Sequence, residues 1–309
     1  MANPYLPSWE YIPDGEPRVF GDRVYVYGSH DCVDCERFCD YKLKVWSASV
    51  HDLSHWTCHG DIFRSKAKEG KTTDTPWTEH ELYAPDVVEK DGKYYLYAYI
   101  VDAKGCVAVS DRPEGPFMML SQYQYNIPDH YDNGTFIDPG VLVDDDGTGY
   151  LYFGGIGDTT DKPEDFIKNP KCGRVVKLAD DMVSLAGDPV TIDAPYMFED
   201  SGINKIGDKY YYSYCTNWTN FSGRDENVPT ANIAVMESDN PMTGFKFVGC
   251  VLKNPGTYFG ASGNNHHCFA EFKGTWYAFY HTKKDTLALG TKGDYRTTYA
   301  DILNLGENG

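Results

Sequence analysis

Residues 91–99, DGKYYLYAY, join a turn pair to an aromatic run in which a tyrosine follows the first turn residue by four positions. Asp-Gly pairs favour tight hairpin turns, and an alternating aromatic run is typical of a half-buried strand. This pattern of a turn pair followed by a tyrosine occurs five times, at Gly21-Asp22 with Tyr25, Asp91-Gly92 with Tyr95, Asp146-Gly147 with Tyr150, Gly207-Asp208 with Tyr211, and Lys273-Gly274 with Tyr277. Successive tyrosines are 70, 55, 61 and 66 residues apart. Each step has room for about four short strands, which predicts an all-β, five-bladed β-propeller.

The predicted propeller forms one catalytic domain over residues 1–309. Its blades are expected at residues 14–60, 80–120, 134–190, 198–250 and 262–309. Because the ring must close without an exposed edge, the residues before position 14 are expected to join the last blade. The longest irregular stretches, 59–80 and 121–134, are where the loops of a binding site are expected.

The composition excludes two classes of partner. The net charge is -18, and no basic patch is present, whereas phosphate binding needs clustered Lys and Arg, so no nucleic-acid partner is expected. No stretch reaches the roughly 18 apolar residues of a membrane span, so no membrane partner is expected. The 25 tyrosines suit β-strands and also the flat faces of sugars. Nothing in the sequence indicates an oligomeric state.

Nine cysteines, an odd number, lie mostly inside expected strands, which is typical of buried free thiols. They favour a reducing compartment, and we expect a cytoplasmic protein unless a signal peptide has been removed. The closely spaced Cys32, Cys35 and Cys39 could hold zinc together with Cys58 or His55. A second pair at matching spacing is absent from the sequence, so free loop thiols are the favoured interpretation.

Four ionisable residues stand at nearly equivalent places in the repeat. They lie eleven or twelve positions before a repeat tyrosine: Asp14, Asp138, Glu199 and His266. The strand at this offset pairs with the tyrosine strand and should be innermost in its blade, so the four side chains are expected to converge on the central channel. Asp86 lies nine positions before its tyrosine, which suggests a different depth along the axis. Clustered carboxylates are costly to bury, so their convergence indicates a functional site.

Three segments, in this order and at blade spacing, resemble glycoside hydrolase family 43. They are NPYLPSWEYIPDGEPRVFGDRVYVYGSHD at 3–31, TFIDPGVLVDDDGTGYLYFGG at 135–155 and FEDSGINKIGDKYYYSY at 198–214. Members of this family are five-bladed propellers that act on arabinose- and xylose-containing polysaccharides. The resemblance covers nearly the whole chain and implies the same fold and chemistry here.

The resemblance also implies roles for the three acids. Asp14 falls on the catalytic base, Glu199 on the general acid, and Asp138 on the residue that orients the acid and tunes its pKa. The family usually has Asp-Pro at the base, whereas this chain has Asp14-Gly15-Glu16-Pro17. Glu16 therefore stays a second, less favoured candidate for the base. Cleavage of a glycosidic bond needs two carboxyl groups in these roles.

Further residues are implied by resemblance around the pocket. YAPDVVEKDGKYYLYAY at 83–99 has Tyr83 where the family commonly has tryptophan, and Asp86 follows as a pocket or structural residue. Arg296 resembles an arginine that binds substrate hydroxyls or holds a carboxylate in place, with a surface arginine as the alternative. His30 is predicted to contact substrate. His266 resembles a histidine that faces the channel near a calcium ion or a water network, with a satisfied core histidine as the alternative.

The implied activity is that of an inverting glycoside hydrolase that needs no cofactor for its chemistry. Inversion predicts about 6.5–9.5 Å between the carboxyl groups of Asp14 and Glu199, which leaves space for a water. The chain lacks the C-terminal β-sandwich of many β-xylosidases of the family. This favours an α-L-arabinofuranosidase or exo-1,5-α-L-arabinanase that releases L-arabinose from arabinan or arabinoxylan-type oligosaccharides of plant cell walls. A β-xylosidase or endo-arabinanase stays an alternative, and a non-catalytic carbohydrate-binding propeller is the alternative of another class.

Overall fold

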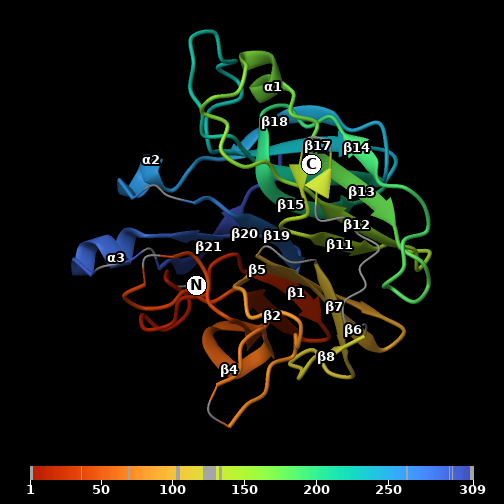
Figure 1. Ribbon diagram of the computed structural model, residues 1–309, viewed down its shortest axis with the longest axis vertical. Coiled ribbons are helices and arrows are strands. Elements are labelled where there is room, and N and C mark those ends of the chain that lie inside the picture. The colour runs from red at the N-terminus through yellow and green to blue at the C-terminus, as the bar shows by residue number, and fades with distance from the viewer. Residues whose placement is uncertain are drawn as a thin grey trace. The chain divides into compact units, whose positions relative to one another are not determined.

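The computed structural model describes residues 3–35, 37–68, 70–101, 105–120, 130–131, 134–261, 264–291, 293 and 295–306. Contacts within the chain group into two compact units (Figure 1). The first unit consists of Met1–Gln124 and Pro255–Gly309, and the second of Tyr125–Asn254. The single domain expected over residues 1–309 stays a prediction.

The first unit contains three antiparallel sheets whose strands are hydrogen-bonded in chain order. The first sheet has β1 (Glu16–Phe20), β2 (Arg23–Gly28), β3 (Lys42–Ser49) and β4 (Asp52–Arg64). The second has β5 (Leu82–Lys90), β6 (Lys93–Ile100), β7 (Cys106–Ser110) and β8 (Met118–Met119). The third has β19 (His267–Phe272), β20 (Thr275–Thr282) and β21 (Thr297–Leu303). Two short helices, α2 (Gly256–Phe259) and α3 (Lys284–Leu289), lie in the loops around this sheet.

The second unit contains two four-stranded sheets of the same kind. One has β11 (Gly140–Val143), β12 (Gly149–Phe153), β13 (Gly173–Lys177) and β14 (Val190–Ile192). The other has β15 (Met197–Ile206), β16 (Lys209–Thr216), β17 (Ile233–Ser238) and β18 (Lys246–Leu252). A two-stranded ribbon, β9 (His130–Tyr131) and β10 (Gly134–Thr135), and helix α1 (Glu164–Lys168) complete the unit. None of the helices found in the described residues has the length and apolar character that crossing a membrane requires.

These five sheets are the blades that the repeat predicts, and the all-β, five-bladed β-propeller class is confirmed. The expected blade limits agree with the sheets to within six residues, although β4 continues to Arg64 into a stretch expected to be a loop. Most of the other expected loop, 121–134, lies outside the described residues. Before position 14, Asn3 contacts the last sheet through its side chain, which bonds both the N–H and the carbonyl of Ala300 at 2.9 and 3.1 Å.

The turn geometry explains why four of the five copies of the repeat begin with Gly or Asp. Asp91 and Gly92 both have positive φ, 53° and 74°, in a two-residue hairpin between Lys90 and Lys93. This backbone matches the right-handed twist of the flanking strands, and Asp, Asn and Gly adopt it at low cost. Around Asp146 the turn is longer, because Val143 pairs with Gly149. The repeat therefore predicted the hairpin there, but not its length.

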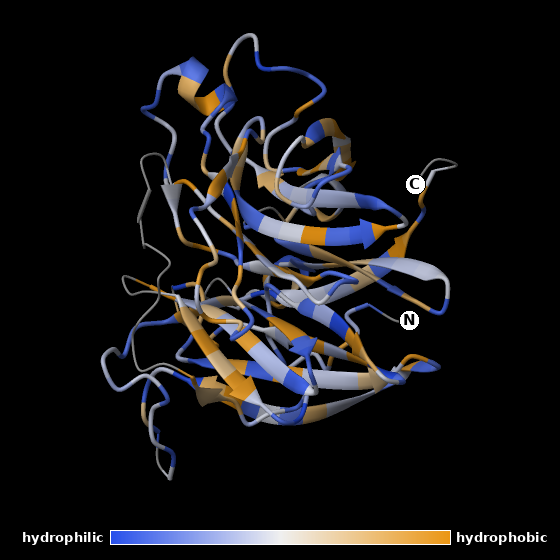
Figure 2. Ribbon diagram, turned by 90° about the vertical axis from the view of Figure 1, so that its right-hand side faces the viewer, coloured by the Kyte–Doolittle hydropathy of each residue, from blue (hydrophilic) through white to orange (hydrophobic). Residues whose placement is uncertain are grey.

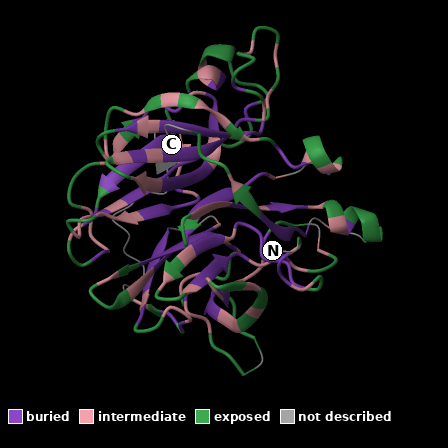
Figure 3. Ribbon diagram, turned by 180° about the vertical axis from the view of Figure 1, so that it is seen from behind, coloured by how far each residue is buried: buried purple, intermediate pink, exposed green. Residues whose placement is uncertain are grey.

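The tyrosine strands form the core of each unit. Hydrophobic residues gather along the strands, whereas most connecting loops are hydrophilic and exposed (Figures 2 and 3). Tyr27 and Tyr152 are fully buried, and their hydroxyls donate at 2.6 Å to the carbonyls of Pro113 and Pro241, respectively. Each of these bonds runs from the second strand of one sheet to a loop of the next sheet. The aromatic repeat thus joins neighbouring blades as well as filling them.

Candidate active site

Asp14 and Asp138 occupy the same local conformation in their sheets. Each lies two residues before the first strand of its sheet, and each is at most 6% exposed. Their φ angles are 54° and 47°, in the left-handed region that residues other than glycine rarely adopt. Such strained positions concentrate at functional sites. The equivalence predicted from the repeat therefore extends to the backbone of these two acids.

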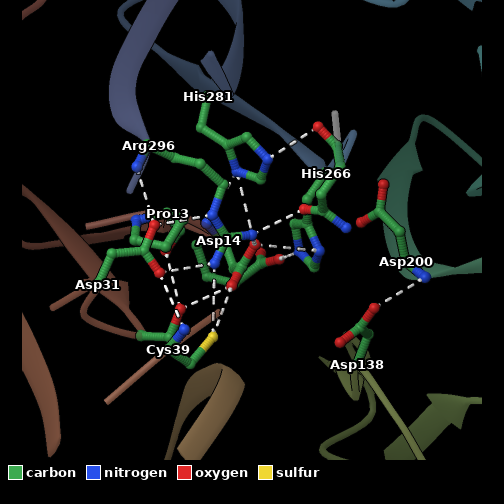
Figure 4. Close-up of polar contacts among 12 residues, drawn as sticks. Pro13, Asp14, Asp31, Cys39, Asp138, Asp200, His266, His281 and Arg296 are labelled. Atoms are coloured by element: carbon green, nitrogen blue, oxygen red, sulfur yellow. Dashed lines mark hydrogen bonds and ion pairs between the residues drawn. The ribbon is translucent and has the colours of Figure 1, made fainter. Parts of the chain in front are cut away.

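Polar groups surround the Asp14 carboxylate on both oxygens (Figure 4). Arg296 Nη1 donates to Oδ1 at 3.1 Å, and the hydroxyl of Ser29 donates to Oδ2 at 2.6 Å. Burial alone would raise the pKa of Asp14, but the nearby charges of Arg296 and His266 and the bond from Ser29 outweigh it and hold the pKa well below its usual range. Asp14 is therefore an ionised, oriented carboxylate at neutral pH, as a general base must be.

Arg296 is buried and uses every N–H of its guanidinium within the protein. Nε and Nη2 donate to the two oxygens of Asp31 at 2.8 and 2.9 Å. The remaining donors contact Asp14, Asn264 at 2.8 Å and the sulfur of Cys39 at 3.4 Å. Of the roles expected for Arg296, these contacts favour the one that holds carboxylates in place. They do not fit the alternative of a surface arginine.

His281, which the sequence reasoning missed, fixes the backbone of Asp14. The N–H of Asp14 donates to His281 Nδ1 at 3.2 Å, and His281 Nε2 lies 3.2 Å from the carbonyl oxygen of Asn264. Nδ1 must be the acceptor, so the ring proton is on Nε2. Burial, assisted by Arg296, lowers the pKa of His281 to about 3. The ring is therefore neutral, and it supports the strained turn without adding charge.

Ser29 and His281 share a position that could have revealed them. Each lies four residues after a repeat tyrosine, Tyr25 in the first case and Tyr277 in the second. This places both at the end of the second strand of a sheet, beside the start of the first strand. Asp31, two residues after Ser29, is fully buried and was also missed.

His266, the predicted metal residue, lies between two carboxylates. Its Nδ1 is 3.9 Å from Asp14 Oδ1, and its Nε2 is 3.5 Å from Glu16 Oε1. Its ring stacks on that of His281 with centroids 6.4 Å apart. Among the residues that the structure describes, no group of three or more His, Cys, Asp or Glu side chains could hold a metal ion. The described residues thus offer no ligand set for the expected calcium ion, and the contacts of His266 are those of a buried histidine beside the carboxylates of Asp14 and Glu16.

Asp86 joins two sheets through an ion pair. It is fully buried on β5, and its Oδ1 accepts from Nε of Arg18 on β1 at 2.7 Å, while Nη2 of the same arginine contacts Oδ2. Burial would lower the pKa of Arg18, but Asp86 outweighs it and raises this pKa above its usual range. Between the pocket and structural roles expected for Asp86, these contacts favour the structural one.

Tyr83 and His30 lie close to the Asp14 cluster. Tyr83 is half-buried, and burial raises its pKa, with further contributions from Cys39, Glu81 and Asp14. His30 follows Ser29 in sequence, and its Nε2 is 3.2 Å from Glu10 Oε1. The substrate-binding roles of both residues stay predictions.

Cys39 places a thiol against the same carboxylate. It is buried, and its sulfur is 3.8 Å from Asp14 Oδ2. Burial raises its pKa well above the usual range, so it is protonated and donates to the carboxylate. Next to it, Phe38 covers the Arg296 guanidinium at 4.9 Å. None of the nine cysteines is in a disulfide, and their interpretation as free thiols instead of zinc ligands stays a prediction.

Asp138 and Glu199 lie together in the second unit. Asp138 Oδ2 accepts from the N–H of Asp200 at 3.1 Å (Figure 4). Register shifts on both sides of Glu199, and a φ of 72° at Asp200, show a β-bulge in β15 at this point. Bulges re-aim side chains near functional sites. The bulge orients the start of β15, and Asp138 anchors it through the backbone.

Gly155 allows β15 to approach closely. A Cβ at this position would lie 2.3 Å from Ile137 Cγ2, 3.2 Å from the Phe198 carbonyl oxygen and 3.5 Å from Glu199 Cβ. The first distance is far inside van der Waals contact. Only glycine fits between the segments that carry Asp138 and Glu199 without moving them.

The predicted roles of Glu199 as general acid and of Asp138 as the residue that orients it stay predictions. The predicted distance between the carboxyl groups of Asp14 and Glu199 also stays a prediction.

Known proteins with a similar sequence identify the family of this chain. The family described as glycosyl hydrolases family 43 matches residues 13–309. The arabinoxylan arabinofuranohydrolase of Paenibacillus polymyxa is 39% identical over 309 residues, which cover 94% of this chain and 48% of that protein. The xylosidase/arabinosidase of Thermoclostridium stercorarium is 35% identical over 326 residues, which cover 94% of this chain and 63% of that protein. This chain therefore spans about half to two thirds of the length of these relatives.

A solved structure supports the same relationship. The family 43 arabinoxylan arabinofuranohydrolase of Bacillus subtilis, in complex with cellotetraose, superposes with a TM-score of 0.88 at 34% sequence identity. The superposition covers 99% of this chain and 66% of that chain. The fold is thus shared over nearly the whole chain.

Proposed function

Because the chain belongs to glycosyl hydrolase family 43, we propose that it is an inverting glycosidase that releases L-arabinose from arabinan or arabinoxylan-type oligosaccharides. The observation that carries the proposal is the state of Asp14. This carboxylate is buried, ionised and held on both oxygens by Arg296 and Ser29. A base of this kind can accept a proton from a water without turning away from it.

In the proposed reaction, Asp14 takes a proton from a water that attacks the anomeric carbon. Glu199 gives its proton to the leaving oxygen, and Asp138 keeps the acid segment in place through Asp200. The water attacks opposite to the leaving group, so the configuration at the anomeric carbon inverts. Arg296 and His281 are positioning residues in this scheme, since they contact the base and other protein groups.

Asp14 is preferred over Glu16 as the base for a physical reason. The contacts of Asp14 stabilise its charge on both oxygens, whereas Glu16 lies next to His266 at 3.5 Å, within β1. General-base catalysis needs an ionised group that keeps its orientation. Asp14 meets both conditions in the described structure.

The sugar released is the finer part of the proposal. The arabinoxylan arabinofuranohydrolases of Paenibacillus polymyxa and Bacillus subtilis support arabinose release from arabinoxylan. The relative named xylosidase/arabinosidase keeps β-xylosidase action as the second candidate. We place the protein in the cytoplasm as part of the proposal, supported by its free cysteines.

The test is release of monosaccharide from a matched panel of substrates. Arabinan oligosaccharides, arabinoxylan oligosaccharides and linear xylo-oligosaccharides are incubated with the wild-type protein and with Glu199→Gln. We expect arabinose from the first two, and none from the variant. Xylose alone would select β-xylosidase action, shortened arabinan chains without monosaccharide would select endo-arabinanase action, and binding of any panel sugar without hydrolysis would leave the non-catalytic propeller.

A further inference from the structure

A pocket lies in the first unit, lined by residues outside the clusters around Asp14 and Glu199. Its volume is about 360 Å³, within the range of small-molecule sites. It lies between the end of β4, the chain that follows β4 at 70–74, and residues 116–117 before β8. Its polar lining residues are Asp61, Arg64, Lys71, Thr72 and Asp74.

Arg64, one of the lining residues, has an unused donor. Its side chain is 8% exposed, its Nη2 pairs with Asp61, and its Nη1 donates to the Lys66 carbonyl at 3.4 Å. Its Nε is buried and has no hydrogen-bond partner among the described residues. An unpaired buried N–H is costly, so the site favours a molecule that brings an acceptor oxygen.

Asp74, which also lines the pocket, brings acceptor oxygens and is bonded to the backbone of Arg64. Asp74 Oδ2 accepts from the backbone N–H of Arg64 at 2.8 Å, and the Asp74 N–H donates to the Arg64 carbonyl at 2.7 Å, so the two residues are fixed to each other. A carboxylate has about four acceptor sites, so Asp74 can accept further hydrogen bonds. Burial raises the pKa of Asp74, because its backbone partner and the nearby cations do not fully offset the loss of water. A residue with an unused donor and a residue with spare acceptor sites therefore both line the pocket.

The charges of the lining decide the class of ligand. Asp61 and Asp74 carry two negative charges, and Arg64 and Lys71 carry two positive ones, so the lining is formally neutral. An anion would be repelled by the two carboxylates, and a cation would be repelled by Arg64 and Lys71. A hydroxyl group both donates and accepts, so it suits a mixed site of this kind. Pro116 is exposed at the rim and offers an apolar surface to C–H groups.

We propose that this pocket is a second, non-catalytic site that binds a neutral sugar unit of the polysaccharide, with a ring hydroxyl accepting from Arg64 Nε and a hydroxyl donating to Asp74. The identity of the polysaccharide rests on the proposed function. Such a site holds a long chain on the protein while the catalytic residues act elsewhere on it. Two weak sites on one chain raise the apparent affinity for polymer, but not for a single sugar.

The experiment compares binding of polymer with hydrolysis of a small substrate. Retardation in native gels that contain soluble arabinoxylan is measured in the Glu199→Gln background, which leaves the polymer intact. Hydrolysis of p-nitrophenyl α-L-arabinofuranoside is measured in the otherwise wild-type protein. Arg64→Lys keeps the pairing with Asp61 but removes Nε. Thr72→Phe fills the pocket from an exposed position, and Thr57→Phe, at an exposed position of β4 outside the pocket, is its control.

We expect Arg64→Lys and Thr72→Phe to weaken retardation at least threefold, with Thr57→Phe unchanged and the small substrate hydrolysed within twofold of wild type. Retardation equal to that of the parent in both pocket variants, or no retardation of the parent, overturns the site. The same variants are also run in gels that contain the acidic polymer polygalacturonate. If they lose retardation by polygalacturonate and keep retardation by arabinoxylan, the neutral-sugar assignment is overturned. Arabinoxylan retardation that depends on Arg64, in a protein that hydrolyses no substrate, supports the site and contradicts only the proposed activity.

Discussion

Arg296 ties Asp14 to Asp31: its Nη1 donates to Asp14 Oδ1 at 3.1 Å, while its Nε and Nη2 donate to both oxygens of Asp31. The two carboxylates lie on either side of one guanidinium and are 17 positions apart in the sequence. The geometry makes Arg296 the group that keeps the Asp14 carboxylate ionised and oriented. It also explains why a charge so deeply buried is tolerated, since each charge is paired and hydrogen-bonded.

Arg296→Lys should move the acidic limb of the pH profile. A lysine cannot reproduce the planar fork, so the pKa of Asp14 should rise, by about one unit or more. Protonated Asp14 cannot accept a proton, so kcat/KM should begin to fall at a higher pH than in the wild type, and kcat should drop about tenfold or more at neutral pH. The measurement is kcat/KM against pH with Arg23→Lys as control, because the side chain of Arg23 bonds Ser47 and, among the described residues, forms no ion pair with a carboxylate. An unchanged acidic limb in Arg296→Lys would show that Arg296 does not lower the pKa of the catalytic base.

His281→Gln should change the pH dependence of stability. The pKa of His281 is lowered to about 3 in the folded protein, whereas in the unfolded chain it is about 6.5. Between these values the unfolded state binds the extra proton, so His281 costs stability as the pH falls from about 6.5 towards 3, by about 1.4 kcal/mol per pH unit. Unfolding in urea at a series of pH values should show a slope smaller by up to one proton in the variant. The exposed His80→Gln is the control, and equal slopes for His281→Gln and wild type would contradict a neutral buried ring.

Gly155→Ala should impair both stability and turnover. The new Cβ would lie 2.3 Å from Ile137 Cγ2, so the segments of Asp138 and Glu199 must move apart. Overpacking of this kind costs about 1–3 kcal/mol, and small shifts of catalytic groups lower kcat. Thermal unfolding and kcat should both recover in part in Gly155→Ala combined with Ile137→Ala. Gly157→Ala, which has no atom within 4 Å of its Cβ, should behave as wild type. A Gly155→Ala protein with wild-type kcat would show that the close approach is not needed.

Asp86→Asn should lower stability and leave substrate affinity unchanged. The substitution leaves the partly buried Arg18 beside a neutral group, and breaking a buried ion pair costs about 3–5 kcal/mol, which is an upper bound here because Arg18 is partly exposed. The free energy of unfolding is measured in urea, and KM on arabinofuranosides reports on the pocket. Arg18→Met combined with Asp86→Leu should regain part of the stability, because it removes both charges. A raised KM with unchanged stability would instead make Asp86 a substrate ligand.

The sequence predicted more of the fold than of the candidate site. The turn pairs with their tyrosines were sufficient to predict five sheets, because each hairpin is local in sequence and its turn chemistry is specific. The equivalent offsets of Asp14 and Asp138 were also readable, and the two share a left-handed backbone. The repeat did not predict the longer turn at Asp146, since several loop lengths are compatible with the same turn residues.

Contacts between distant segments could not be predicted in the same way. Asp14 bonds His281 and Arg296 across 267 and 282 positions, and nothing in a single sequence relates them. The conservative prediction for Arg296 left its role open, because hydroxyl binding and carboxylate binding use the same guanidinium. The calcium ion expected beside His266 came from resemblance alone, and the described residues around it offer carboxylates that pair with the histidine instead.

The measurement that tests the central claim most directly compares aryl α-L-arabinofuranosides with good and poor leaving groups in Asp14→Asn, Glu199→Gln and the wild type. A good leaving group needs no proton, so Glu199→Gln should hydrolyse the 2,4-dinitrophenyl substrate within a few fold of wild type and lose about 10²–10⁴-fold on a poor leaving group. Asp14→Asn should lose a similar factor on both substrates, because the water still needs its base. A wild-type rate for Asp14→Asn on either substrate would contradict the assignment of Asp14 as the base.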